Sequence, residues 1–263
     1  MKPREMEQEM SPKWDRSPEW LKEKERRDFE YWQQSPVASP RSETTEYLIS
    51  RAGKMKVFWE KLTRHLTVFE RAQTILELGA GQCWASCIVK KEWPDKRVVA
   101  TDLAPAAVES AHRWERIFDV KLDGVCSSPG YATPFRDQSF DLVFCFAAAH
   151  HFVRHRETFA ELHRVLRKGG TILYMHETGC RRIFYPLIFK HVSGQRSDMF
   201  EDALVYRELS TMAADCGLDA DVVFDPTLTD RGPFETLYFS LLKRSRWLQS
   251  LLPCSIDMVL TRI

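Results

Sequence analysis

The sequence predicts an α/β fold in which a mainly parallel sheet has helices on both faces, a three-layer, doubly wound arrangement. Apolar runs of strand length alternate with helical segments, and these runs lie near 74–78, 97–101, 121–126, 140–146 and 171–176. Such alternation is typical of parallel sheets. Ligands of these sheets bind over the carboxyl ends of the strands, where the strand order reverses. Glu77, Asp102, Phe146 and His176 all lie at predicted strand ends.

The segment before the first strand predicts a helical cap. Residues 1–16 are polar and are expected to form a mobile tail. Ser17-Pro18 is a typical helix start, and the prolines at 36 and 40 should end that helix. A second helix is expected over roughly 43–69, with an apolar face made of Leu48, Ile49, Met55, Phe58, Trp59 and Leu62. The expected organisation is a cap over 17–70 and a main domain over 71–263.

The last third of the chain continues the alternation, with two interruptions. A helix over 200–216 leads to a strand over 218–225, and 256–262 reads as the final strand. Helical inserts are expected over about 181–200 and 230–254. Both carry apolar residues with basic edges, and three interpretations stay open: packing on the domain itself, walls of a pocket for a hydrophobic ligand, or contact with a membrane surface.

The composition argues against several classes of protein. The 263 residues include 38 Lys or Arg and 37 Asp or Glu, so no overall field draws the chain to nucleic acid. Seven cysteines without a Cys-x-x-Cys pair predict reduced thiols in the core. With no signal peptide and no 18-residue apolar run in the sequence, a cytoplasmic protein is expected. No feature predicts the oligomeric state.

The loop after the first strand distinguishes two kinds of nucleotide site. Gly79 and Gly81 let the backbone approach a ligand, and Glu77 can accept hydrogen bonds from an amine. A dinucleotide site would also have glycine at position 84, where this chain has Trp84. The next strand ends in Asp102, whose carboxylate can accept from both hydroxyls of a ribose. The loop therefore favours a ligand with an amine and a ribose over NAD.

Four ordered segments resemble the motifs of the class I S-adenosylmethionine-dependent methyltransferases that act on small molecules. They lie at 75–81, 100–103, 133–143 and 164–170, within roughly residues 70 to 178. The resemblance implies a Rossmann-like, seven-stranded sheet whose last strand is antiparallel. It also implies S-adenosylmethionine as the cofactor, S-adenosylhomocysteine as the product, and a small-molecule acceptor.

The resemblance assigns cofactor contacts, with two departures from the family pattern. Cys83 stands where the family often has a third glycine, and Ser128-Pro129-Gly130 stands where an Asp-Ala pair often contacts adenine. Leu103 is expected to pack on the adenine ring, with backbone groups near Gly130 and Tyr131 replacing the missing carboxylate. The complete expected set is Glu77, Gly79, Ala80, Gly81, Asp102, Leu103, Tyr131 and Phe146, joined by Tyr31 and Arg51 of the cap.

The cap has two interpretations. Its aromatic residues can simply attach the helices to the sheet, or the cap can act as a lid over the ligands. In the second case Tyr31, a hydrogen-bond donor, and Arg51, a guanidinium, are candidates to meet the methionine carboxylate.

The catalytic candidates are histidines, because a hydroxyl acceptor must lose a proton near neutral pH. His150 and His151 follow the fourth strand, where the family often has a similar pair, and His150 is the first choice of base. A structural role for both is the alternative. His176, together with Glu177, ends the fifth strand and is a further candidate. His151 and His155 have metal-ligand spacing, but nothing supplies a third ligand, so no metal is expected.

Three functions remain open. The first is an O-methyltransferase acting on a secondary metabolite, a sugar or a lipid-linked acceptor. The second is an N- or C-methyltransferase acting on a similar scaffold. The third is a protein that binds S-adenosylmethionine without methylating anything. The intact Glu77, Gly79, Gly81 and Asp102 favour an enzyme.

Overall fold

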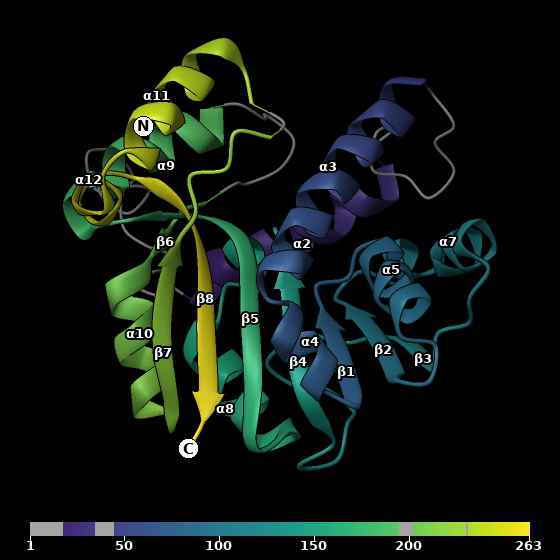
Figure 1. The fold of residues 1–263 in the computed structure, drawn as a ribbon. Coiled ribbons are helices and arrows are strands. Elements are labelled where there is room, and N and C mark those ends of the chain that lie inside the picture. Colours follow the sequence, from purple (N-terminus) through teal and green to yellow (C-terminus); the bar gives the residue numbers. More distant parts are fainter. Residues whose placement is uncertain (1–17, 35–44, 195–201, 230) are drawn as a thin grey trace.

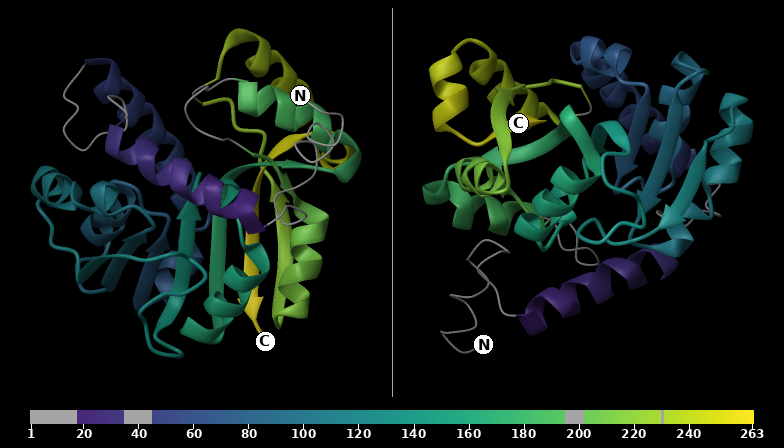
Figure 2. Two further views of the ribbon diagram at one scale, coloured as in Figure 1. Left: turned by 180° about the vertical axis from the view of Figure 1, so that it is seen from behind. Right: turned by 90° about the horizontal axis from the view of Figure 1, so that it is seen from below.

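A computed structural model describes residues 18–34, 45–194, 202–229 and 231–263. It has one sheet with helices on both faces, as Figures 1 and 2 show. The predicted tail over 1–16 and the helix cap at Ser17 lie outside the described residues.

The sheet is mainly parallel, and the predicted antiparallel last strand is confirmed. Its order is β3-β2-β1-β4-β5-β8-β7, in which β8 runs antiparallel to both of its neighbours. A two-residue strand, β6, also pairs with the end of β5, so the sheet has eight strands where seven were expected. The strands are β1 (Thr74–Leu78), β2 (Arg97–Asp102), β3 (Gly124–Ser127), β4 (Phe140–Phe146), β5 (Leu166–Cys180), β6 (Leu204–Val205), β7 (Leu218–Phe224) and β8 (Cys254–Arg262).

Helices cover the sheet because its central strands are apolar on both faces. The α-helices are α2 (Pro18–Gln34), α3 (Thr45–Arg64), α4 (Leu66–Arg71), α5 (Trp84–Glu92), α6 (Pro105–Val108), α7 (Ala111–Phe118), α8 (His155–Val165), α9 (Tyr185–Gly194), α10 (Tyr206–Asp215), α11 (Pro233–Lys243) and α12 (Arg246–Leu251). One core cluster packs α3, α5 and α7 on one face, and a second packs α8 and α10 on the other. The 3₁₀ turns are η2 (Ala149–His151) and η3 (Arg182–Phe184).

The second cap helix differs from its prediction in two respects. It is divided at His65 into α3 and α4. Its expected apolar face is also too long, because Leu48 is 47% exposed and Ile49 is 68% exposed. Figure 1 shows the first turns of α3 projecting beyond the strands, and of the predicted face Phe58 and Leu62 reach the core.

The fifth strand is longer than predicted and contains a bulge. It covers Leu166–Cys180, whereas the sequence pattern indicated 171–176. Tyr174 pairs with Met258 and Glu177 with Ile256, so β5 has two residues where β8 has only Asp257. His176 takes a left-handed conformation there, with φ 62°. A bulge of this kind changes which side chains face each side of a sheet.

Candidate active site

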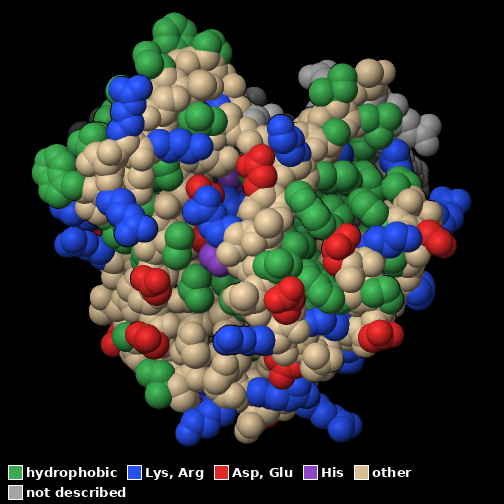
Figure 3. Space-filling model, viewed as in Figure 1, with side chains coloured by type: hydrophobic (Ala, Val, Ile, Leu, Met, Phe, Trp, Pro, Cys, Tyr) green, Lys and Arg blue, Asp and Glu red, His purple; other side chains and the backbone are tan. Residues whose placement is uncertain are grey.

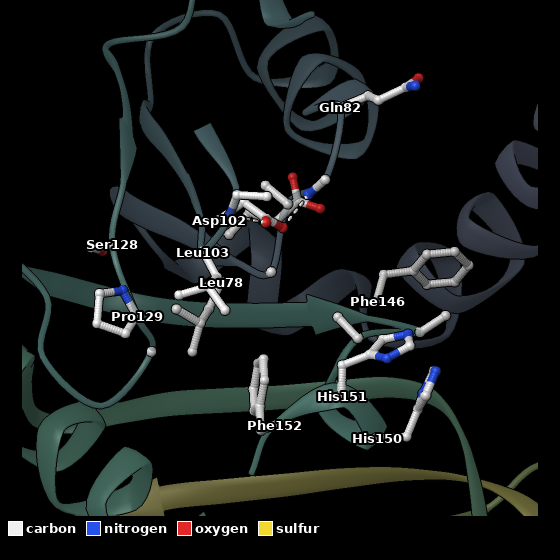
Figure 4. Close-up of a pocket in the computed structure, with 18 of the residues that line it drawn as sticks. Leu78, Gln82, Asp102, Leu103, Ser128, Pro129, Phe146, His150, His151 and Phe152 are labelled. Carbon is white, nitrogen blue, oxygen red and sulfur yellow. Dashed lines mark hydrogen bonds between the residues drawn. The ribbon is translucent and has the colours of Figure 1, made fainter. Parts of the chain in front are cut away.

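One cavity at the carboxyl ends of β1, β2 and β4 brings together the predicted site residues, except for His176. It lies where the strand order reverses, between β1 and β4. In Figure 4, His150 and His151 lie side by side near Phe146, across the cavity from Asp102 and Leu103. The predicted residues that line it are Tyr31, Arg51, Glu77, Gly79, Ala80, Gly81, Asp102, Leu103, Tyr131, Phe146, His150 and His151.

The loop after β1 needs glycine at its first position. Gly79 has φ 71°, and a Cβ there would lie 2.8 Å from the Cβ of Ala148. Cys83, in the place of the family's third glycine, also has a positive φ, of 65°, just before α5. Position 83 thus keeps the left-handed backbone conformation that glycine favours. This conformation is strained for Cys83, because cysteine has a side chain. Cys83 is fully buried, and burial raises the pKa of its thiol well above the usual value.

Glu77 enters the cavity from the buried end of β1. Its Oε2 accepts a hydrogen bond from the backbone N–H of Ser86 at 2.9 Å and another from the Ser86 hydroxyl. Burial raises the pKa of Glu77 to about 8, although Ser86 acts in the opposite direction. A buried carboxylate with this shift gains most from a cationic partner, such as an ammonium group.

Replacing Glu77 tests this burial through the pH dependence of stability. The folded state keeps Glu77 protonated up to about pH 8, whereas the unfolded chain loses this proton near the ordinary carboxyl pKa. The free energy of unfolding therefore falls as pH rises between these two values. The free energy of unfolding of Glu77→Gln, relative to that of the parent, should therefore rise by roughly 3 kcal/mol between about pH 5 and pH 8, because glutamine does not titrate. Urea unfolding at both pH values measures this, with the exposed Glu92→Gln as control. Parallel pH profiles for parent and variant would contradict the shift.

Asp102 joins the glycine loop to the segment after β2. Its Oδ2 accepts from the N–H of Gly81 at 2.8 Å, and its Oδ1 accepts from the N–H of Ala104 at 2.9 Å. Leu103 follows it, 36% exposed at the cavity wall. Beside them, Ser128, Pro129 and Gly130 follow β3 and occupy the place of the family's adenine carboxylate. The Ser128 hydroxyl pairs with that of Thr101 at 2.9 Å, which fixes this wall to β2.

The two cap helices reach the cavity from opposite sides. Figures 1 and 2 show α3 on one side of the strand ends and α2 on the other. Arg51 of α3 lies over the ring of Tyr47, 5.4 Å from its centre, and Tyr47 donates a hydrogen bond to Gln82 of the loop after β1. Tyr47 is buried, and the sequence analysis did not single it out.

The contacts of α2 at the rim involve Tyr131. The guanidinium of Arg154 lies over the Tyr131 ring, 4.7 Å from its centre. Arg154 also pairs with Glu25 of α2 at 3.5 Å. The two cap helices therefore contact the cavity through polar as well as apolar side chains.

Glu177 orients His150, a role that the sequence pattern did not reveal. The Nδ1 of His150 lies 2.8 Å from Oε2 of Glu177. Glu177 is 1% exposed, and its oxygens also accept from the backbone N–H groups of Ala148, Ala149 and His150, at 3.0, 2.9 and 3.2 Å. Because a carboxylate only accepts, the His150 Nδ1 carries the hydrogen and Nε2 is the basic nitrogen.

His176 does not join the other candidates at the cavity. The bulge in β5 places its ring against Phe146, on the side of the sheet that faces α3, with 5.6 Å between ring centres. Glu177 faces the other side, toward η2. Burial, together with the cations Lys54, Lys61 and Arg231, lowers the pKa of His176 well below its usual value. Strict alternation along β5 would have placed His176 on the η2 side of the sheet and Glu177 on the α3 side. The bulge reverses this placement.

His151 remains beside His150, while its predicted metal partner lies elsewhere. The rings of His150 and His151 have centres 4.1 Å apart. His155 is buried, with its ring near Phe152 and Phe159. Within the described ranges, no group of three or more His, Cys, Asp or Glu side chains is placed to hold a metal ion.

Comparison with known proteins points to one family. Residues 76–174 match the family model of a methyltransferase domain. The chain is 24% identical over 158 residues to a demethylmenaquinone methyltransferase of Thermus thermophilus, covering 59% of this chain and 70% of that protein. It is 30% identical over 103 residues to a malonyl-[acyl-carrier protein] O-methyltransferase of Herminiimonas arsenicoxydans, covering 39% of this chain and only 36% of the relative.

A solved structure of similar fold covers more of the chain. It is a putative sarcosine dimethylglycine methyltransferase from Galdieria sulphuraria, with a TM-score of 0.55 and 16% identity, covering 91% of this chain and 98% of that one. At this identity the likeness concerns the fold. Of the four sequence motifs, 75–81 and 100–103 contribute residues to the cavity, whereas 133–143 and 164–170 lie outside its lining, at the start of β4 and of β5.

Proposed function

Since this chain is a class I S-adenosylmethionine-dependent methyltransferase, we propose that it methylates a hydroxyl group of a small-molecule acceptor, with His150 as general base. The observation that carries this proposal is the contact between His150 and Glu177. A buried carboxylate that holds the Nδ1 hydrogen leaves Nε2 to take a proton, and it stabilises the imidazolium that results. An acceptor hydroxyl beside Nε2 would lose its proton to that nitrogen as its oxygen bonds the methyl carbon, while the bond from that carbon to the cofactor's sulfur would break and leave S-adenosylhomocysteine.

The cavity residues suit the cofactor that this reaction requires. S-adenosylmethionine supplies an electrophilic methyl group when bound. Glu77, whose pKa is raised by burial, would pair with the cofactor's ammonium group. Asp102 has lone pairs beyond its two backbone contacts to accept from ribose hydroxyls, and Leu103 offers an apolar wall for adenine. Tyr31 and Arg51 are the proposed partners of the cofactor carboxylate.

The acceptor is proposed to be hydrophobic. Phe29, Phe146 and Phe152 line the cavity near the histidines and cap, and apolar walls favour an apolar body around a single reactive hydroxyl. One relative is named a demethylmenaquinone methyltransferase and another a malonyl-[acyl-carrier protein] O-methyltransferase, and the second name supports transfer to oxygen. N- or C-methylation of a similar scaffold is the alternative.

A binding and product assay tests the proposal. Calorimetry should show binding of S-adenosylmethionine and S-adenosylhomocysteine but not of NAD. Mass analysis after incubation with hydroxyl, amine and activated-carbon acceptors should then show a methylated hydroxyl. Products methylated only on nitrogen or carbon would favour the alternative. Cofactor binding without any methylated product would indicate a non-catalytic binding protein.

Replacing Asp102 should weaken cofactor binding. Asp102→Ala removes the ribose acceptor and also frees the N–H groups of Gly81 and Ala104, which it holds at 2.8 and 2.9 Å. We expect a loss of about 1 to 3 kcal/mol in binding of S-adenosylhomocysteine, measured by calorimetry. The exposed Asp219→Ala in β7 is the control and should bind normally. Equal affinities for the two variants would place the ribose elsewhere.

A further inference from the structure

The surface of α11 and α12 has an apolar stripe that the core does not use. Phe234, Leu237 and Leu241 have one-face helical spacing, and they are 88%, 64% and 50% exposed. Trp247 of α12 is 69% exposed. The inner face of α11 is already satisfied, because Phe239 and Leu242 pack with Cys254 in a cluster of their own. The domain-packing interpretation therefore accounts for the inner residues and leaves the outer stripe unexplained.

Basic side chains lie among these apolar ones. Lys243, Arg244 and Arg246 are exposed between Leu241 and Trp247, and none of the three forms an ion pair with any residue that the structure describes. In Figure 3, hydrophobic side chains protrude at the top and left of the molecule, where Figure 1 draws α11 and α12, with Lys and Arg side chains between them. We call these seven residues the α11–α12 face: Phe234, Leu237, Leu241, Lys243, Arg244, Arg246 and Trp247.

The neighbouring segment of η3 and α9 continues the same composition. Arg181 donates to the carbonyl of Ser250 at 2.8 Å, which ties the start of this insert to α12. Ile183 and Leu187 are 79% and 67% exposed. Residues 181–192 and 233–252 together contain six Lys or Arg and a single carboxylate, Glu235, although the chain as a whole is almost neutral. The positive charge is thus concentrated where the apolar side chains protrude.

We propose that the α11–α12 face docks on the surface of an anionic lipid bilayer. Large apolar side chains beside Lys and Arg on short helices are the chemistry of interfacial membrane binding, in which the rings enter the headgroup region and the cations meet lipid phosphates. Exposed apolar side chains alone would suit a protein partner equally well, and the adjacent cations favour the anionic bilayer. No helix among the described ranges is long and apolar enough to span a bilayer, so this contact would be peripheral.

The position of the face fits this use. In Figure 1, α9, α11 and α12 all lie at the upper end of the sheet, the end at which β1 and β4 terminate. The cavity opens over those same strand ends. Docking through α11 and α12 would therefore bring the cavity end of the molecule toward the bilayer. The proposal does not depend on which atom is methylated, because it rests on the surface alone.

Vesicle sedimentation with the full chain tests the proposal. The chain should sediment with vesicles that contain phosphatidylglycerol and stay in solution with phosphatidylcholine alone, and added salt should weaken the binding. Neutralising the three cations (Lys243→Gln, Arg244→Gln, Arg246→Gln) should weaken it about a hundredfold, since each such charge contributes roughly a factor of five. Replacing Phe234, Leu237 and Leu241 by serine should abolish it.

Matched controls separate docking from general effects. Lys91→Gln, Arg116→Gln and Lys168→Gln remove three exposed cations elsewhere, and Ile117→Ser removes an apolar side chain that is 57% exposed on α7. These variants should sediment like the parent, and calorimetry with S-adenosylhomocysteine confirms that each variant is folded. Absence of vesicle binding, or equal losses in the controls, would overturn the proposal. So would a dimer in solution that the serine variant dissociates, because the face would then bind a second copy of the chain.

Discussion

His150→Ala should lower kcat by about 10²- to 10⁴-fold, the range that loss of a general base usually gives. The Nδ1 of His150 is fixed by Glu177 at 2.8 Å, so its Nε2 can accept a proton without reorientation. Alanine removes that nitrogen and leaves the loop geometry, because the backbone bonds from Ala148 and Ala149 to Glu177 do not involve the imidazole. Affinity for S-adenosylmethionine should change little.

Two further variants distinguish a base from a structural residue. His151→Ala removes the neighbouring ring, 4.1 Å away between centres, and should retain most of the turnover. Glu177→Gln keeps a side-chain acceptor for the loop but removes the negative charge that stabilises the imidazolium, so the rise of kcat with pH should move to a lower pH. Normal turnover in both His150→Ala and Glu177→Gln would assign proton removal to another group, or indicate an acceptor that needs no base.

The residues proposed to bind the cofactor lie together in the cavity because they belong to local patterns. Glu77, Gly79 and Gly81 follow one another along a single strand and turn, and Asp102 ends the adjacent strand, so any parallel pairing of β1 and β2 brings them together. Cys83 shows the limit of motif matching. A residue other than glycine occupies a left-handed position there, with φ 65°, and the turn is preserved.

The proposed catalytic side was less predictable, because the placement of His176 and Glu177 depends on one extra residue in β5. None of Met175, His176 and Glu177 is a glycine or proline that would mark the bulge, and simple alternation assigns the side chains of His176 and Glu177 to the wrong faces. The bulge is stabilised from β8, where Oδ1 of Asp257 accepts from the backbone N–H of His176 at 2.9 Å. This contact joins residues 81 positions apart, and no local pattern reports it.

Asp257 belongs to a buried charge network that also fixes the cap. Lys61 of α3 lies 2.6 Å from Oδ1 of Asp257 and 2.7 Å from Asp225, while Nε2 of His65 lies 3.0 Å from Oδ2 of Asp257. Burial alone would raise the pKa of Asp257, but the contacts with His65 and Lys61 outweigh it and hold this pKa at about 2. One carboxylate therefore connects the helix that carries Arg51 to the bulge that turns Glu177 toward His150.

Lys61→Met should lower the free energy of unfolding by about 3 to 5 kcal/mol, because it leaves two buried carboxylates without their shared cation. Lys61 is 1% exposed and Asp257 is fully buried, so water cannot replace the lost partner. Urea unfolding at neutral pH measures the change. Lys56→Met, at an exposed position on the same helix, should stay within about 0.5 kcal/mol of the parent.

The pH dependence of the same variant identifies the cause. In the parent, the folded-state pKa of Asp257 is about 2, below its ordinary value, so the stabilisation is present near neutral pH and is lost as pH falls through about 4 toward 2. Without Lys61 the pKa of Asp257 must rise toward or above its ordinary value, so the loss of stability on acidification should shrink or disappear. A destabilised variant that keeps the parent's acid profile would show that Lys61 acts through packing of its aliphatic chain. The expected profile would instead show that a charge contact across the sheet holds both the cap and the β5 bulge in place.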